Sequence, residues 1–371
     1  MKEGTLDRKY MFFINYSEFI FLIYFAYLCK FKLKSKYSKI LVFLTISILP
    51  SIISFKFISY SSIYFLLLLL LIPFLLEWSL KQQYLFTNVN IEKIVLSLIV
   101  AGLFTKFHQG YVHGQDSYAG SFIYGLLSRG GGVNASNHIG GILLVFYPLL
   151  HRRSVKLIVI LFLLICFSRG IYITFTLIIL VNLFYTHKIT FKSFLYFIIF
   201  LFLTFVIFIQ FPHIYNEFTT RLITFSLIFE NDRFTIFYES IKLFVNSFFL
   251  GVGPTNFYYA LNSANNSFEF SNAHNMFITV LVENGVFFSS VFIFLIFNLF
   301  KDSFKIQRKY MMSLFVFCFY GLFSGQLYEC SLGKVSFYDF FYLIFIISLI
   351  TNKYLKKNNH LSAITYKKNF A

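Results

Sequence analysis

The chain of 371 residues is 58% hydrophobic and 22% aromatic, only 13% of its residues are charged, and its mean hydropathy is +0.73. This composition lies outside the range of soluble globular proteins, and the apolar runs are continuous rather than alternating, which argues against a β-barrel. It predicts an all-α polytopic membrane protein with a single integral membrane domain over residues 1–371. The formal net charge of +17 raises the question of a nucleic-acid partner, which depends on where the charges lie.

The sequence predicts about eleven transmembrane helices, within a range of 10 to 12. In chain order they are 11–28, 40–58, 62–80, 94–107, 138–150, 156–168, 171–186, 192–211, 275–299, 311–328 and 336–351. Several are shorter than the roughly 20 residues that a straight helix needs to cross a hydrocarbon core of about 30 Å.

Basic residues gather between these spans. Six segments hold 21 of the 32 lysines and arginines and only two of the 15 acidic residues. They are 30–39, 81–93, 151–156, 187–192, 301–309 and the tail from 352 to 371. The positive-inside rule assigns them to the cytoplasmic face, so the tail is a cytoplasmic basic tail and residues 212–274 form a large extracytoplasmic loop. Membrane orientation accounts for the positive charge, and no nucleic acid is expected as a partner.

The apolar stretch 155–186 is interrupted by Ser168-Arg169-Gly170. One straight helix over it would be about 48 Å long, which exceeds the bilayer core and would separate two basic loops onto opposite faces. Two short helices that meet at this triplet keep both loops cytoplasmic and bring Arg169 to the outer face. Arginines inside membrane segments are costly, so Arg169 is a candidate functional residue.

The large extracytoplasmic loop is expected to contain a short amphipathic helix on the membrane surface. Asn231-Asp232-Arg233 fits a helix start, and the helix should run to about Asn246. Its apolar residues recur at helical spacing, namely Phe234, Phe237, Ile241, Phe244 and Val245. Gly251-x-Gly253-Pro254 predicts a turn, and His274 stands where the next span begins.

Six short motifs follow one another between residues 120 and 300. They are Arg129-Gly130-x-x-Val133-Asn134-x-x-Asn137, Ser168-Arg169-Gly170, Arg233 with Tyr238, Gly251-x-Gly253, Ala273-His274-Asn275 and Glu283-x-Gly285. In this order and spacing they resemble the O-antigen polymerase and O-antigen ligase superfamily of bacterial envelope glycan enzymes.

The resemblance implies a glycosyltransferase in the bacterial plasma (inner) membrane whose active site faces the periplasm or cell exterior. Its donor would be an undecaprenyl-pyrophosphate-linked oligosaccharide. Arginine is always charged and makes paired hydrogen bonds to phosphate oxygens, so Arg169 and Arg233 are expected to bind the pyrophosphate and stabilise its developing charge. His274 is the expected general base, because histidine has an unperturbed pKa of about 6.5. The expected substrate-binding residues are Arg129, Asn137, Asn256 and Asn275.

No metal and no cofactor are expected. His108, His113 and Asp116 lie scattered in a glycine-rich segment without the spacing of a ligand set. The expected partners are the lipid-linked oligosaccharide and the bilayer, and the resemblance adds a polysaccharide chain-length regulator.

Three functions stay open from the sequence. The leading one is polymerisation of lipid-linked repeat units into a surface polysaccharide such as O-antigen, capsule or exopolysaccharide. A ligase that moves a finished chain onto lipid A-core or protein would use the same donor. A transporter of lipid-linked oligosaccharide is a third, but it would distribute charged or glycine- and proline-broken positions through many spans.

Overall fold

The structure is a computed structural model. It describes residues 23–24, 26–28, 30, 32–54, 60–81, 87–116, 134–165, 169–186, 198, 202, 232–254, 256–257, 260–261, 275–323, 329–331, 334–336 and 343–353. The expected spans 11–28 and 192–211 lie mostly outside these residues. Residues 212–231 and 262–274 of the predicted large loop, and the tail after 353, lie wholly outside them.

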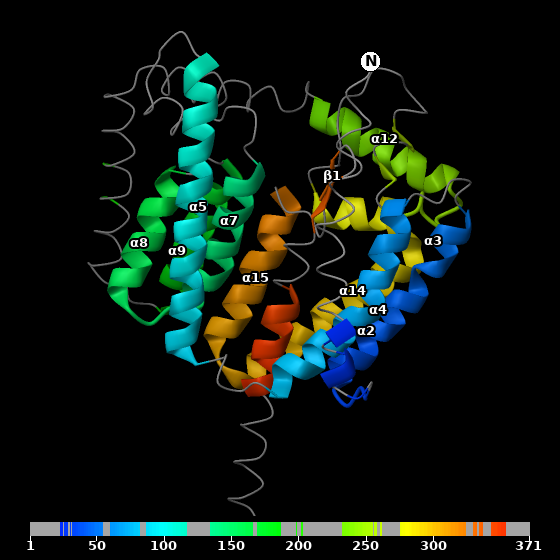
Figure 1. The fold of residues 1–371 in the computed structure, drawn as a ribbon, viewed down its shortest axis with the longest axis horizontal. Coiled ribbons are helices and arrows are strands. Elements are labelled where there is room, and N and C mark those ends of the chain that lie inside the picture. Colours follow the sequence, from blue (N-terminus) through cyan, green and yellow to red (C-terminus); the bar gives the residue numbers. More distant parts are fainter. Residues whose placement is uncertain are drawn as a thin grey trace, which may run out of the picture. The chain divides into compact units, whose positions relative to one another are not determined.

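The described chain is helical apart from one short hairpin (Figure 1). The helices are α2 (Lys36–Ser47), α3 (Leu49–Ser54), α4 (Tyr60–Lys81), α5 (Asn88–Asp116), α7 (Asn134–Phe146), the 3-10 turn η2 (Tyr147–Leu149), α8 (Arg153–Ile165), α9 (Arg169–Thr186), α12 (Asp232–Asn246), α14 (Met276–Ile306) and α15 (Arg308–Phe323). A final helix covers Leu343–Lys353. The antiparallel strands β1 (Glu329–Ser331) and β2 (Lys334–Ser336), which the sequence did not predict, pair Cys330 with Val335.

The helical fold class is confirmed, and several predicted boundaries need correction. The interruption of 155–186 is confirmed, because α8 ends at Ile165 and α9 begins at Arg169. The span expected at 94–107 belongs to a longer helix, since α5 continues to Asp116 through residues expected in a loop. Glycines at 110 and 114 lowered the helix prediction there, but each costs only about 1 kcal/mol in a helix. The last span was expected to begin at 336, but Ser336 lies in β2, and the described helix there covers Leu343–Lys353.

Two helical segments in the described chain are long and apolar enough to cross a membrane, Lys36–Ile53 and Met276–Ile306. Large apolar side chains also stand exposed on these helices, among them Phe43 at 64% and Ile53 at 81%. Soluble proteins rarely expose such stripes, so this is a membrane protein's surface. The count of about eleven spans stays a prediction.

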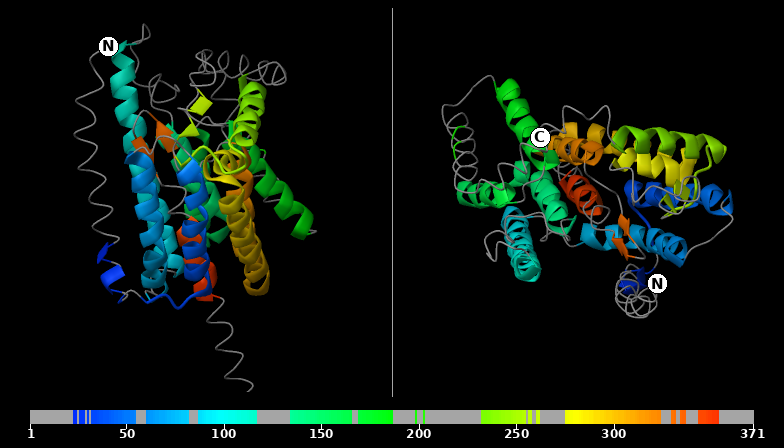
Figure 2. Two further views of the ribbon diagram at one scale, coloured as in Figure 1. Left: turned by 90° about the vertical axis from the view of Figure 1, so that its right-hand side faces the viewer. Right: turned by 90° about the horizontal axis from the view of Figure 1, so that it is seen from above.

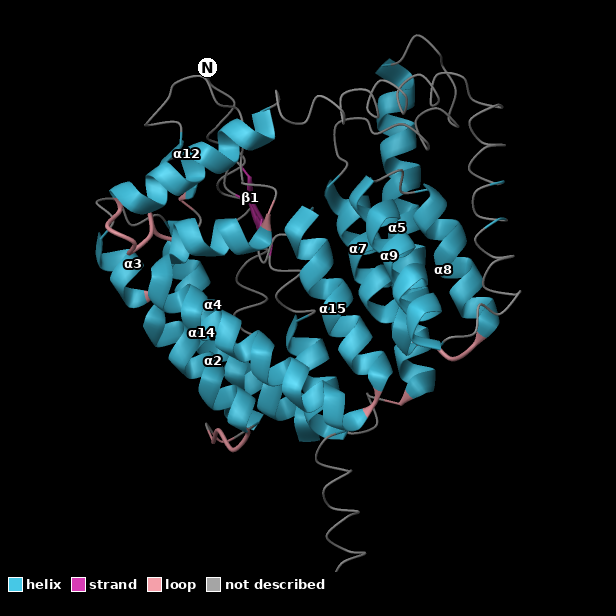
Figure 3. Cartoon of the chain, turned by 180° about the vertical axis from the view of Figure 1, so that it is seen from behind, coloured by secondary structure: helices cyan, strands magenta, loops and turns pink. Residues whose placement is uncertain are grey.

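The described helices divide between two compact units. The first comprises the described parts of residues 1–87, 235–311 and 321–371, and the second those of 88–234 and 312–320. In the first unit α2 packs against α4 and also against α14 (Figures 2 and 3). A buried carboxyl fixes the start of α2, because Glu77 of α4 accepts hydrogen bonds from the backbone N–H groups of Lys34 (2.8 Å) and Ser35 (2.5 Å).

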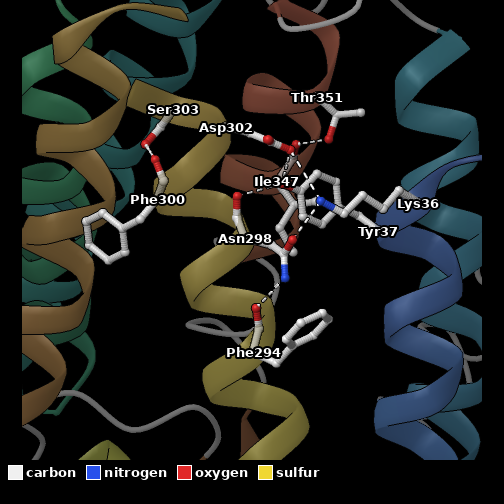
Figure 4. Close-up of polar contacts among 9 residues, drawn as sticks. All are labelled: Lys36, Tyr37, Phe294, Asn298, Phe300, Asp302, Ser303, Ile347 and Thr351. Atoms are coloured by element: carbon white, nitrogen blue, oxygen red, sulfur yellow. Dashed lines mark hydrogen bonds and ion pairs between the residues drawn. The ribbon is translucent and has the colours of Figure 1, made fainter. Parts of the chain in front are cut away.

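A second buried carboxyl joins α2 to α14 (Figure 4). The Tyr37 hydroxyl donates to Asp302 Oδ2 at 2.6 Å, and the Lys36 ammonium lies 3.7 Å from the same oxygen. Lys36 also donates to Asn298 Oδ1 at 2.7 Å. The Lys36 side chain is about half exposed, so the solvent-screened ion pair adds little and the Tyr37 bond dominates.

We expect Tyr37→Phe to lower the free energy of unfolding by about 1–2 kcal/mol, because it leaves the buried Asp302 carboxyl without that donor. Lys36→Met should change it by less than about 1 kcal/mol. Thermal unfolding of the two variants in detergent measures the difference. An equal or larger effect of Lys36→Met would show that the ion pair, rather than the hydroxyl, holds the helices together.

In the second unit α5 packs against α7 and α8, and α7 packs against α9. Buried Glu92 near the start of α5 accepts from the backbone N–H groups of His151 (3.1 Å) and Arg152 (2.8 Å), while its other oxygen pairs with Arg152 Nε at 3.2 Å. The start of α8 is therefore held on α5. Within residues 312–320 of α15, the Ser313 hydroxyl donates to the Val145 carbonyl of α7 at 2.7 Å.

Candidate active site

A helix at the predicted position is confirmed as α12, Asp232–Asn246, and its place in an extracytoplasmic loop stays a prediction. One face is buried, through Ile236, Ser240 and Phe244. Phe237 and Val245, from the predicted apolar stripe, are 45% and 50% exposed and form a flank beside that buried face. Phe244, another residue of the predicted apolar stripe, is buried in the hydrophobic core and is not on the exposed flank. The placement of this flank on the membrane surface stays a proposal.

The end of α12 is strained. Phe248 and Phe249 have φ of 53° and 64°, in the left-handed region that costs a residue with a side chain about 1–2 kcal/mol. Their N–H groups close the helix by donating to the carbonyls of Val245 and Phe244. The Phe249 ring packs edge-on against Phe244 with centroids 5.2 Å apart. This turn directs the chain from α12 toward Gly251.

Helix α14 is broken at Gly285, which has φ 77° and ψ 179°. Figure 1 shows the part before the break, in yellow, running across the direction of the remainder. After the break, exposed apolar side chains follow one another from Val286 to Phe304. That stretch is about 27 Å long at 1.5 Å per residue, close to the roughly 30 Å of a hydrocarbon core. The break therefore marks the point where a membrane-length helix begins.

The turn after α12 supplies the backbone hydrogen bonds that the break removes from α14. The N–H groups of Val252 and Gly253 donate to the carbonyls of Val282 (2.8 Å) and Glu283 (2.9 Å). The Val286 N–H donates to the Phe249 carbonyl at 2.9 Å. Backbone groups without water must be satisfied within the protein, so the turn and the broken helix depend on one another.

Two glycines permit this close approach. Gly251 has φ 90°, and a Cβ there would stand 2.6 Å from the Glu283 carbonyl oxygen. A Cβ at Gly285 would overlap the Leu250 carbonyl. Two motifs that begin 32 residues apart in the sequence, Gly251-x-Gly253 and Glu283-x-Gly285, thus form one structure. We call it the glycine latch, comprising residues 249–253 and 282–286.

The glycine latch continues into a small hydrophobic core. Glu283 is 2% exposed, and its Oε1 accepts a hydrogen bond from the Phe257 backbone N–H at 3.0 Å. The core residues come from α12, from the segment after the turn and from α14, namely Ile236, Phe244, Val252, Phe257, Ala260, Leu261 and Val282. The segment 251–261 is therefore fixed between α12 and α14 wherever the structure describes it.

Asn275 begins α14. Its Oδ1 accepts from the backbone N–H groups of Phe277 (3.0 Å) and Ile278 (3.1 Å), which makes it the helix N-cap. Its Nδ2 donates to the Leu322 carbonyl at 3.1 Å. The side chain thus has a structural role, and its expected contact with sugar stays a prediction.

Asn256, the other expected sugar-binding asparagine with a described side chain, is 2% exposed. Its Nδ2 lies 3.4 Å from the Val252 carbonyl, which it reaches as a donor within the turn. This contact stabilises the turn, and a substrate contact by Asn256 is likewise a prediction.

The other predicted site residues are placed by their backbones or not at all. Arg169 is the first residue of α9, Arg233 the second of α12, and Asn137 lies in the first turn of α7, but their side chains lie outside the described part of the chain. Arg129 and His274 lie outside the described residues. Within the residues that were described, no group of three histidine, cysteine or acidic side chains is arranged to hold a metal ion.

A family model described as O-antigen ligase matches residues 154–293. Over these residues the chain is similar to that family. The O-antigen ligase match runs from the start of α8 to beyond the break in α14, and it includes Arg169, Arg233, His274 and the glycine latch. Two of the predicted site residues, Arg129 and Asn137, precede it. A search of curated proteins and a search of solved structures found no match.

Sequence reasoning named Glu283 only as part of a motif and gave it no role. The signal was present, because a carboxyl within an apolar stretch, two residues before a glycine, is costly to bury unless it is hydrogen-bonded. What the sequence did not show was the partner, the Phe257 amide, which stands 26 residues earlier.

Proposed function

We propose that this membrane protein is a glycosyltransferase that polymerises undecaprenyl-pyrophosphate-linked oligosaccharide repeat units into a surface polysaccharide. The reaction takes place on the outer face of the plasma membrane. The observation that carries the proposal is the O-antigen ligase match over residues 154–293, which includes the three candidate catalytic residues Arg169, Arg233 and His274.

In the proposed reaction an acceptor hydroxyl oxygen attacks the anomeric carbon of the donor sugar, and the bond from that carbon to the pyrophosphate oxygen breaks. His274 takes the hydroxyl proton as general base. Undecaprenyl pyrophosphate leaves with the bonding electrons, and Arg169 and Arg233 stabilise its charge. Arg129, Asn137, Asn256 and Asn275 are proposed substrate contacts. The two guanidinium groups supply the positive charge, so the proposal requires no metal.

The architecture supports an active site at the membrane surface. The start of α14, at Asn275, directly follows His274 in the sequence, and the glycine latch joins this start to the membrane-length part of the helix. A lipid-linked donor presents its pyrophosphate at the level of the lipid headgroups, where α12 and the first part of α14 are proposed to lie. Growing chains would leave toward the cell exterior, where a chain-length regulator would act.

The description of the matching family favours a second candidate, transfer of a finished glycan to lipid A-core or protein by a ligase. Donor, leaving group and catalytic residues would be the same, and only the acceptor would differ. The experiment below separates the two.

Surface glycan from cells that lack the gene, resolved by chain length on a gel, tests the proposal. We expect single repeat units on their normal carrier, and long chains restored by the wild-type gene but not by Arg169→Ala, Arg233→Ala or His274→Ala. Full-length chains on undecaprenyl pyrophosphate would indicate a ligase. Lipid-linked units confined to the cytoplasmic face would indicate a transporter and refute the site.

A further inference from the structure

The start of α8 carries three cationic side chains within one turn of helix. Arg152 and Arg153 are exposed, and Lys156 is half-buried. We call these three residues the α8 basic cluster. The cluster and its neighbours on α5, η2 and α9 belong to the second compact unit.

Two of the three cations are held in place by neighbouring elements. The buried Glu92 carboxylate of α5 pairs with Arg152 Nε at 3.2 Å, yet 66% of the Arg152 side chain stays exposed, so the guanidinium is fixed and accessible at once. The Lys156 ammonium lies 5.5 Å from the centroid of the Tyr147 ring, and that ring packs edge-on against Phe175 of α9. A cation that is already held loses less side-chain freedom when it binds an anion, so these contacts favour a bound ligand.

An exposed apolar stripe on α8 begins at the basic cluster. Leu157, Ile158 and Leu161 are 47%, 40% and 43% exposed. Leu157 and Leu161 follow Arg153 at the four-residue spacing that places side chains on one face of a helix. The opposite face is buried, through Val155, Val159, Phe162 and Leu163. Since an exposed apolar stripe on a membrane protein contacts acyl chains, the cluster stands where the lipid headgroups begin.

We propose that the α8 basic cluster binds the headgroup of an anionic phospholipid whose acyl chain lies along this stripe. Arginine makes paired hydrogen bonds to phosphate oxygens, and lysine adds a point charge. The three cations outnumber the one carboxylate that contacts them, so the cluster keeps a positive charge. The positive-inside rule assigns residues 151–156 to the cytoplasmic face, where the leaflet has a negative surface potential. The inference concerns lipid binding and does not depend on the proposed glycosyl transfer.

Native mass spectrometry of the full-length protein in detergent, titrated with phosphatidylglycerol or phosphatidylcholine, tests the site. We expect one phosphatidylglycerol to bind about tenfold more tightly than phosphatidylcholine, and Arg152→Gln or Arg153→Gln to weaken its binding about fivefold. Equal Kd values for the two lipids would overturn the proposal. Displacement of phosphatidylglycerol by an equal concentration of undecaprenyl phosphate would assign the cluster to the polyprenyl carrier and overturn it as well.

Lys301→Gln is the matched control for Arg153→Gln. Lys301 is exposed near the end of α14, one turn from the exposed Phe297 and Phe304, so the substitution removes the same charge beside a similar apolar surface. It should change the Kd for phosphatidylglycerol by less than about twofold, because charges far from the bound headgroup are screened by salt. A loss equal to that of Arg153→Gln would indicate general attraction to basic surface and refute the site.

Two further variants separate a positioned cluster from net charge. Tyr147→Leu keeps every charge but removes the ring beneath Lys156, and it should weaken phosphatidylglycerol binding about threefold. Glu92→Gln makes the protein more positive but takes the carboxylate partner from Arg152. A positioned cluster predicts weaker binding in Glu92→Gln, whereas tighter binding would show that net charge alone attracts the lipid and would overturn the proposal. If Glu92→Gln fails to fold, the comparison of the exposed positions Arg153 and Lys301 still decides.

Discussion

Gly285→Ala should unfold the glycine latch. Its backbone, at φ 77° and ψ 179°, lies in a region that is essentially restricted to glycine, and the new Cβ would overlap the Leu250 carbonyl. Since backbone atoms on both sides of the contact are hydrogen-bonded, neither side can move away without losing bonds. We expect a loss of about 3 kcal/mol or more in the free energy of unfolding, and a transfer rate close to background.

Gly321→Ala is the control for Gly285→Ala. Gly321 lies in α15 with ordinary helical geometry, and the nearest atom to a new Cβ is the end of the flexible Met276 side chain, at 2.7 Å. Helix propensity favours alanine there by about 1 kcal/mol, which offsets the displaced methionine. Melting temperatures in detergent compare the two variants. Similar melting temperatures for Gly285→Ala and wild type would contradict the close approach of the turn to α14.

His274→Ala should lower the rate of transfer about 10²- to 10⁴-fold, the usual contribution of a general base. The variant should keep the wild-type melting temperature and hydrogen exchange at 249–257, because the hydrogen bonds described between the two parts of the glycine latch join backbone groups. The rate is measured with purified protein in liposomes at saturating donor.

The control for His274→Ala is His360→Ala, which removes a histidine from the predicted cytoplasmic tail and should leave the rate unchanged. Transfer by His274→Ala at the wild-type rate would remove histidine from the proposed mechanism. A rate loss accompanied by a lower melting temperature would point to a structural role instead.

Local features of this protein could be predicted from its sequence where local chemistry decides them. The interruption at Ser168-Arg169-Gly170 follows from helix length against bilayer thickness, and α9 does begin at Arg169. The start of α12 follows from capping residues before a periodic apolar run, and α12 does begin at Asp232. The start of α12 is decided within about one turn of helix by residues adjacent in sequence.

Features that depend on distant contacts could not be predicted in the same way. Gly251 and Gly285 each indicate a turn or a flexible position, but only the fold shows that each makes room for the other. The sequence predicted one span at 275–299, whereas α14 runs from Met276 to Ile306 and is broken at Gly285. The break was missed because the backbone bonds that stabilise it come from the loop before the helix.

The helix-capping role of Asn275 could have been predicted from the sequence, which instead led to its assignment as a substrate-binding residue. An asparagine directly before an apolar run is a favourable helix N-cap, and the structure uses it as one. The sequence analysis assigned Asn275 to sugar binding, but both the oxygen and the nitrogen of its side-chain amide form hydrogen bonds with backbone groups. Asn275→Ser, which retains a capping oxygen, is therefore a better probe of sugar binding than Asn275→Ala.

The central claim is that this protein forms glycosidic bonds from a lipid-linked donor. Its most direct test is the release of undecaprenyl pyrophosphate by the purified wild-type protein in liposomes that contain undecaprenyl-pyrophosphate-linked repeat units. We predict one undecaprenyl pyrophosphate released for each bond formed, with glycans that lengthen by whole repeat units. Repeat units that cross the bilayer still attached to their lipid, with none of it released, would contradict the claim.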